Sequence, residues 1–74
     1  MKKNKDKDLK TLGFNIKVER MKRDLSQDQF VEISGLLNSQ HLSKIENADV
    51  DMRVSTLIKI LRALKVKFED LIEL

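Results

Sequence analysis

The stretch SGLLNSQHLSKIEN, from Ser34 to Asn47, decides the fold that is predicted for this sequence. Gly35 ends one expected helix, residues 27–34, because glycine readily takes the left-handed conformation that closes a helix. Asn38 is a suitable N-cap for a second expected helix, residues 39–47, because an asparagine side chain accepts hydrogen bonds from the free N–H groups of a first turn. The sequence therefore predicts two short helices joined by a tight turn.

The second of these helices has an apolar side and a side of short polar groups. Leu42 and Ile45 lie at helical spacing and are expected to face inward. The outward side carries Ser39, Gln40, Ser43, Lys44 and Asn47. Two short helices joined by a glycine turn are typical of a helix-turn-helix, whose second helix can lie in the DNA major groove. Short side chains allow a close approach to the bases, and amides, hydroxyls and ammonium groups are the types that read base edges.

Helical spacing of apolar residues around this pair predicts three further helices, over residues 9–23, 52–64 and 68–74. Ser26 and Gln29 form a capping box at the start of the first helix of this pair. Strand patterns such as alternating Val, Ile and Thr are missing, and so are Asn-Gly turns. The expected fold is all-α: a compact five-helix bundle with the helix-turn-helix at its second and third helices.

The outer helices supply most of the expected core and the expected self-association surface. Asp8 and Asp51 are the expected N-caps of the first and fourth helices. On the fourth helix the expected buried residues are Val54, Leu57, Ile58, Leu61 and Leu64. Ile60 lies off that stripe and is either a surface residue or part of a dimer seam. At the end of the chain, a core lid or a dimer patch is expected from Leu71, Ile72 and Leu74, and the small size of the core favours the patch.

The composition limits the possible functions. The chain has 74 residues, enough for one domain with a small core. It contains no cysteine and a single histidine, so no disulfide framework, no metal site and no cofactor are expected. The apolar runs are far too short to span a membrane and no signal peptide is recognisable, so we expect a soluble, cytoplasmic protein without membrane contact.

The net charge of +3 originates at the N-terminus. Residues 1–10 contain five lysines and two aspartates, whereas basic and acidic side chains balance over residues 11–74. We therefore divide the chain into a flexible basic arm, residues 1–8, and a helix-turn-helix DNA-binding domain, residues 9–74. Such an arm is either a solubilising tail or a segment that meets an anionic partner such as a nucleic acid backbone.

Three stretches carry a resemblance to a known family: LGFNIKVERMKRDLSQDQF (12–30), SGLLNSQHLSKIEN (34–47) and VSTLIKILRALKVKFEDL (54–71). They are similar to the Xre family of helix-turn-helix regulators, the class that includes phage lambda-type repressors and Cro. The resemblance covers about residues 12–71. It implies a lambda-repressor-like bundle and sequence-specific binding of double-stranded DNA by a transcriptional regulator, commonly as a two-fold homodimer.

The resemblance also implies roles for individual residues. The base-reading positions correspond to Ser39, Gln40 and Lys44, with Ser43 and His41 beside them. Backbone contacts correspond to Gln27 and Asn47. His41 is more suited to a flanking surface position or a phosphate contact than to a metal, since the sequence has no second histidine and no cysteine. Arg20 and Glu46 correspond to a partly buried ion pair whose role is to position the recognition helix.

Two departures from the family pattern matter. The turn is one residue longer than usual, with Leu37 as the additional residue, so the recognition helix is expected to enter the groove at a shifted angle. The loop after this helix is usually basic, but here it contains Asp49 and Asp51, which repel phosphate. The basic groups that remain for phosphate binding are Arg53, Lys17, Lys22, Arg23 and the N-terminal arm.

An enzyme is not expected. His41 and Ser43 point to different sides of their helix, neither has a carboxylate at a spacing that would orient it, and the sequence has no nucleophile elbow or phosphate loop. Besides DNA binding, a second hypothesis is an antitoxin or regulatory subunit that uses the same fold to hold a protein partner. The neutral body and the acidic loop favour this hypothesis, and the two functions are compatible.

Overall fold

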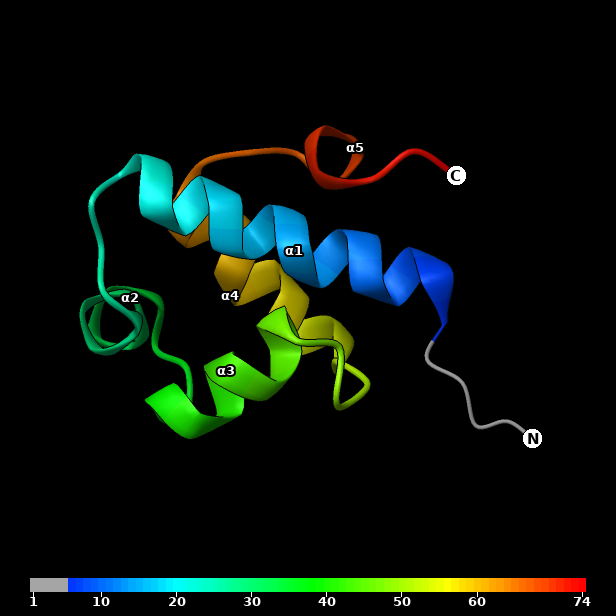
Figure 1. The fold of residues 1–74 in the computed structure, drawn as a ribbon. Coiled ribbons are helices and arrows are strands. Elements are labelled where there is room, and N and C mark those ends of the chain that lie inside the picture. Colours follow the sequence, from blue (N-terminus) through cyan, green and yellow to red (C-terminus); the bar gives the residue numbers. More distant parts are fainter. Residues whose placement is uncertain (1–5) are drawn as a thin grey trace.

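The computed structural model describes residues 6–74, which form five helices (Figure 1). These helices are α1 (Lys7–Lys22), α2 (Gln27–Ser34), α3 (Ser39–Glu46), α4 (Val54–Leu64) and α5 (Phe68–Leu71). No strand occurs in residues 6–74, and the expected all-α fold is confirmed. Most of the predicted basic arm falls on residues 1–5, which lie outside the described residues.

The longest helix, α1, organises the bundle. It runs across Figure 1, with α5 above it, α4 behind it and α3 below it. α1 contacts α3, α4 and α5, and α2 contacts α3 and α4. The pair α2–α3 is therefore supported by α1 on one side and by α4 on another.

Each of the five helices contributes at least one buried side chain to a single core. The largest fully buried residues are Ile16, Phe30, Leu42, Ile45, Ile60, Leu64 and Leu71. Leu42 and Ile45 are thus the inward residues of α3, as the sequence predicts. Full burial of such a side chain contributes about 1.5–3 kcal/mol, so these two residues hold α3 against the bundle.

Gly13 allows α1 to approach the end of α3 closely. A Cβ atom at this position would lie 2.5 Å from the carbonyl oxygen of Ile45 and 2.8 Å from that of Glu46. Both oxygens belong to the backbone, so neither can rotate away. The glycine lies well inside α1, which begins at Lys7, and this close packing against α3 explains why a glycine occupies the position.

α4 turns a different face inward from the one predicted. Ile60 is buried together with Leu64, whereas Val54 is 73% exposed and Ile58 is 42% exposed. The expectation that Val54 and Ile58 lie in the core and that Ile60 lies outside it is wrong. α4 is apolar around more than half of its circumference, so its periodicity allows more than one buried stripe. Contacts with α1 and α2 select the stripe that contains Ile60.

The C-terminal apolar residues close the core. Leu71 and Ile72 are buried, and Asn15 Nδ2 on α1 donates a hydrogen bond of 2.6 Å to the carbonyl oxygen of Leu71. The predicted dimer patch is therefore wrong for Leu71 and Ile72, and of its three residues only Leu74, 93% exposed, lies on the surface. α5 is a single turn that packs on α1, so Leu71 and Ile72 turn toward the core and cover its buried side chains.

α1 begins earlier than predicted. Asp6, rather than Asp8, is its N-cap, and the Asp6 carboxylate accepts hydrogen bonds from the N–H groups of Asp8 and Leu9 at 2.8 and 3.1 Å. The earlier start adds a backbone hydrogen bond of 3.0 Å from Lys10 N–H to the Asp6 carbonyl oxygen. The first turn of α1 therefore occupies the end of the segment that was expected to be a flexible arm.

α4 begins without a side-chain cap. Arg53 occupies the N-cap position and forms no capping hydrogen bond. The expectation that Asp51 caps this helix is wrong, because the helix begins at Val54 and Asp51 lies two residues before the cap position. The N-cap side chain of α4 therefore accepts no hydrogen bond from the first N–H groups of the helix.

Candidate nucleic-acid interface

Local hydrogen bonds that the sequence predicts build the helix-turn-helix. Ser26 Oγ accepts from the Gln29 N–H at 3.1 Å, and Gln29 Oε1 accepts from the Ser26 N–H at 2.8 Å, which completes the capping box of α2. Gly35 ends α2 with a φ of 80°, in the left-handed conformation. Asn38 Oδ1 accepts from the His41 N–H at 2.8 Å and starts α3. The predicted turn between the two helices is therefore confirmed.

The polar side of α3 faces outward. α3 lies at the lower edge of the molecule in Figure 1. Gln40, Lys44 and Asn47 are exposed, whereas Ser39 and Ser43 are half-buried at the border of the polar side. Their exposure makes the Gln40 amide and the Lys44 ammonium group accessible to a partner, which is what a base-reading helix requires.

A buried ionic network attaches the end of α3 to the scaffold. Arg20 Nε on α1 donates to Glu46 Oε2 at 2.8 Å, and the Arg20 guanidinium donates a second bond to Glu46 Oε1 at 3.2 Å. Both side chains are buried, with 9% and 2% of their surface exposed. A third guanidinium nitrogen donates to the carbonyl oxygen of Leu25 at 2.7 Å. This bidentate pair joins the two residues that the family resemblance implies, and it fixes α3 relative to α1.

The same network includes a residue that the sequence assigns to DNA. Gln27 Nε2, in the first turn of α2, donates to Glu46 Oε1 at 3.1 Å. The side-chain amide of Gln27 therefore bonds within the protein and links the start of α2 to the end of α3. Family resemblance alone indicates a phosphate contact for Gln27, and no sequence pattern indicates this internal bond.

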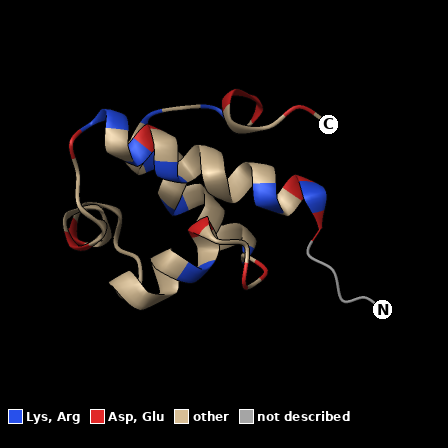
Figure 2. Cartoon of the chain, viewed as in Figure 1, with Lys and Arg blue, Asp and Glu red and all other residues tan. Residues whose placement is uncertain are grey.

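The charges around α3 are sparse and of both signs. Figure 2 shows one blue segment on α3 and a red segment in the loop that follows it. Lys44 is the basic residue of α3, and Asp49 and Asp51 lie in that loop. Lys17 is exposed on α1. The acidic loop raises the free energy of bringing a phosphate close to the end of α3.

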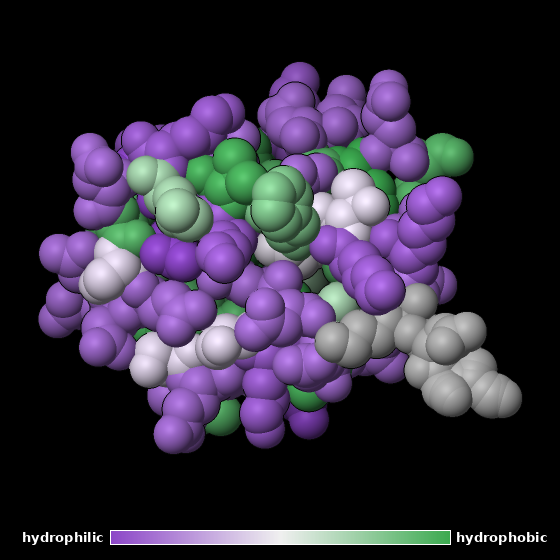
Figure 3. Space-filling model, in the orientation of Figure 1, coloured by the Kyte–Doolittle hydropathy of each residue, from purple (hydrophilic) through white to green (hydrophobic). Residues whose placement is uncertain are grey.

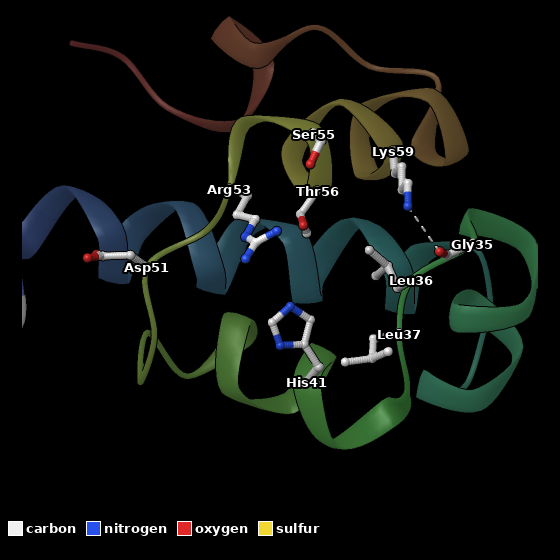
Figure 4. A pocket seen from close by; sticks show the side chains of 9 residues that line it. All are labelled: Gly35, Leu36, Leu37, His41, Asp51, Arg53, Ser55, Thr56 and Lys59. Carbon is white, nitrogen blue, oxygen red and sulfur yellow. Dashed lines mark hydrogen bonds between the residues drawn. The ribbon is translucent and has the colours of Figure 1, made fainter.

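The structure brings two of the predicted backbone-contact residues together. His41 of α3 and Arg53 before α4 both line a cavity between the helix-turn-helix turn and α4, and Figure 4 shows their side chains pointing toward each other. Ser55, Thr56 and Lys59 of α4 line the same cavity. The only signal for these three in the sequence is their place on the polar side of α4.

Together these features define a class of protein. A capped helix, a left-handed glycine, a second capped helix with a polar outer side and a buried ion pair behind it form a helix-turn-helix DNA-binding domain. The model of the helix-turn-helix family HTH_3 matches residues 16–71, and the chain belongs to this family. The family supports DNA-binding transcription regulation as the function, and the predicted resemblance to Xre-type regulators is confirmed.

Solved structures with the same fold include regulators of two kinds. The restriction-modification controller protein C.AhdI from Aeromonas hydrophila is similar with a TM-score of 0.80 and 23% identity, over 88% of this chain and 97% of that chain. The controller protein C.Esp1396I is similar with a TM-score of 0.78 and 24% identity, over 88% and 87%. The clp gene regulator ClgR from C. glutamicum is similar with a TM-score of 0.75 and 19% identity, over 84% and 79%. These similarities establish the fold.

No curated protein sequence is significantly similar to this chain. Among residues 6–74, none of the helices has both the length and the apolar character needed to cross a membrane.

Proposed function

We propose that this protein is a transcription regulator that binds a specific sequence of double-stranded DNA as a homodimer in the cytoplasm. The outward polar side of α3 carries the proposal, because Gln40 and Lys44 are exposed there while Leu42 and Ile45 hold the helix against the core. A helix supported in this way can enter the major groove without a change in the bundle.

In this proposal the residues of α3 divide into two sets. Base edges are read by Ser39, Gln40, Ser43 and Lys44. The amide of Gln40 suits adenine and the ammonium group of Lys44 suits guanine, since these pairings match donors with acceptors in the major groove. Contacts with the sugar-phosphate backbone come from Gln27, His41, Asn47, Arg53 and Lys17, and for Gln27 the contact uses a donor besides the one bonded to Glu46.

Replacing Gln40 and Lys44 together with alanine is expected to remove sequence preference. Each good base contact contributes about 1–3 kcal/mol of discrimination, so the pair should account for a loss of on the order of 100-fold in specific affinity. The operator is first selected from a random duplex pool at two salt concentrations, and affinity is then measured on the selected site and on a scrambled site. The matched control is Thr11→Ala with Lys67→Ala, which removes one polar group and one positive charge away from α3. Unchanged preference in the Gln40/Lys44 variant would contradict the assignment.

The homodimer is assigned to α4 instead of the C-terminus. Val54 and Ile58 are exposed at adjacent turns, and Leu57 and Leu61 beside them are half-buried. These four residues, the α4 stripe, are spaced so that they lie on one side of the helix. When a second copy packs its own α4 stripe against this one, each of the two subunits buries the same four residues, as in other two-fold contacts. Two copies of α3 then reach successive major grooves about 34 Å apart.

Replacing Ile58 with aspartate is expected to produce a monomer. A carboxylate in the centre of an apolar contact is costly to desolvate, and loss of the second subunit should weaken operator binding by about 100-fold or more, because the avidity of two linked contacts is lost. Sedimentation velocity and binding to the selected operator measure the two effects. Met21→Asp is the control, since it places the same charge on an exposed apolar residue of α1. Persistence of the dimer in Ile58→Asp would contradict the assignment.

A second candidate function is the holding of a protein partner. Phe14 and Met21 are 60% and 55% exposed on the outer side of α1, with the half-buried Val18 between them. Figure 3 shows apolar atoms on the face of the molecule that α1 forms in this view. This surface lies on a different helix from the α4 stripe and from the polar side of α3, so a partner there is compatible with DNA binding. Retention of a partner by the wild type and its loss in a Phe14→Ser, Met21→Ser variant would support this candidate.

A further inference from the structure

Leu37 is exposed at the start of the helix that is proposed to read DNA. Apart from Leu74 at the end of the chain, it is the most exposed large apolar residue among residues 6–74, with 79% of its surface accessible. It lies in the turn between α2 and α3, two residues before Ser39, the first residue of α3. Its side chain therefore contributes little to the core and is available to a partner that approaches α3.

The backbone on both sides of Leu37 is held in place. Leu36 is buried in the core, and the Asn38 side chain accepts a hydrogen bond of 2.8 Å from the His41 N–H. Leu37 and His41 line the same cavity, and Figure 4 shows the Leu37 side chain next to the first turn of α3. The turn therefore presents Leu37 at a fixed place relative to α3.

The turn itself does not require a leucine at position 37. Exposed turn positions commonly carry glycine, proline, asparagine, aspartate or serine, because these residues favour turn conformations or hydrogen-bond to the turn backbone. Gly35 already supplies the left-handed residue that ends α2. Leu37 is, in addition, the residue by which this turn exceeds the family pattern. Its side chain is therefore free to serve a contact outside the bundle.

The chemistry of leucine limits what it can contact on DNA. A leucine side chain has no hydrogen bond donor or acceptor, so it can match only an apolar group. The base edges in the major groove present donors and acceptors, and the apolar group among them is the C5-methyl of thymine. 5-Methylcytosine carries a methyl group at the same ring position. Because the N-terminal residues of a helix in the major groove lie at the base edges, Leu37 is within reach of such a methyl group.

We propose that Leu37 contacts the 5-methyl group of one pyrimidine in each half of the operator. The proposal rests on the proposed function and adds an apolar contact to the hydrogen bonds made by α3. The contact removes the methyl group and the exposed leucine from water together, which favours the complex. Asn38 is extended, so Leu37 lies about 7 Å from Ser39. The pyrimidine therefore lies within about two base-pair steps of the base that Ser39 contacts.

Uracil tests the contact with thymine. Each thymine of the selected operator is replaced in turn by uracil in both half-sites, which removes the methyl group and keeps the hydrogen-bonding groups of the base. At one position the wild type should bind about 10-fold less tightly, since burial of one methyl group corresponds to about 4-fold in affinity for each half-site. Leu37→Ala should bind the unmodified operator at least as weakly and show no further loss at that position.

5-Methylcytosine tests the other source of the methyl group. Each cytosine of the operator is replaced in turn by 5-methylcytosine in both half-sites. Where Leu37 faces a cytosine, methylation should strengthen binding by the wild type about 10-fold and leave Leu37→Ala unchanged. A response to uracil identifies thymine as the source of the methyl group, and a response to methylation identifies 5-methylcytosine. Either response supports the proposal.

Two further variants separate the contact from general effects on the protein. Met21→Ala is the matched control, because it shortens another exposed apolar side chain on the outer side of α1. It should respond to every base change as the wild type does. Leu37→Met keeps an apolar side chain of similar size and should retain the response to the methyl group. Leu37→Ala should keep the melting temperature of the wild type, as expected for an exposed position.

Three outcomes would contradict the proposal. Equal responses of the wild type and Leu37→Ala to every base change would overturn it, while the proposed function would still hold. A Leu37→Ala protein that keeps full operator affinity but loses a protein partner would also overturn it and would assign Leu37 to a protein contact. A wild type that binds no duplex would overturn the proposed function and this proposal with it.

Discussion

Replacing Gly13 with alanine is expected to destabilise the protein, although alanine is the better helix former. Alanine gains about 1 kcal/mol over glycine inside a helix. Its methyl group would meet the backbone carbonyl oxygens of Ile45 and Glu46 at 2.5 and 2.8 Å, so α1 and α3 would have to move apart. Because overpacking costs about 1–3 kcal/mol and more where the backbone must shift, we expect a net loss of about 2 kcal/mol in the free energy of unfolding. Urea denaturation measures this quantity.

The control for this prediction is an alanine at an exposed position of the same helix. Thr11→Ala should change the free energy of unfolding by no more than about 0.5 kcal/mol, as surface substitutions usually do. Gly13→Ala should also weaken operator binding, because the displaced helix is the one that carries Gln40 and Lys44. A Gly13→Ala protein as stable as Thr11→Ala would show that α1 and α3 are not in the close contact described above.

Replacing Arg20 with methionine is expected to have the largest effect on stability. The change leaves the Glu46 carboxylate buried without the guanidinium that donates two hydrogen bonds to it. Removing one partner of a buried ion pair costs about 3–5 kcal/mol. A domain of this length has a total stability of about 4–11 kcal/mol, so much of the protein should be unfolded at physiological temperature. Circular dichroism during thermal denaturation measures the loss.

The double variant Arg20→Met, Glu46→Leu distinguishes the ion pair from simple loss of packing. Replacing both charged partners with apolar residues is often neutral, so most of the stability should return. Gln27 then loses its acceptor on Glu46, and α3 is less well oriented relative to α2. We therefore expect a folded double variant that binds the operator more weakly than the wild type. A double variant as unstable as Arg20→Met would show that the charge of Glu46 is not the cause.

Local features of the sequence determined the helix-turn-helix. The capping box of Ser26 and Gln29, the left-handed Gly35 and the N-cap Asn38 act over three or four residues, so neighbours in the chain specify their hydrogen bonds directly. The two-sided character of α3 is equally local, because residues at positions 42 and 45 share one side of any helix. Family resemblance added the Arg20–Glu46 pair, which joins residues too far apart in sequence for a local rule to connect.

Only the tertiary structure decided which apolar surfaces are buried. Val54, Ile58 and Ile60 have similar hydrophobicity, and the contacts of α4 with α1 and α2 place Ile60 in the core and the other two on the surface. Leu71 and Ile72 are buried because α5 packs on α1.

Long-range packing also created the cavity between the helix-turn-helix turn and α4, since it brings His41 beside Arg53. Caps and turns depend on neighbours in the chain, which the sequence specifies directly. Burial and cavities depend on which helices meet, and that is set by the packing of the whole bundle.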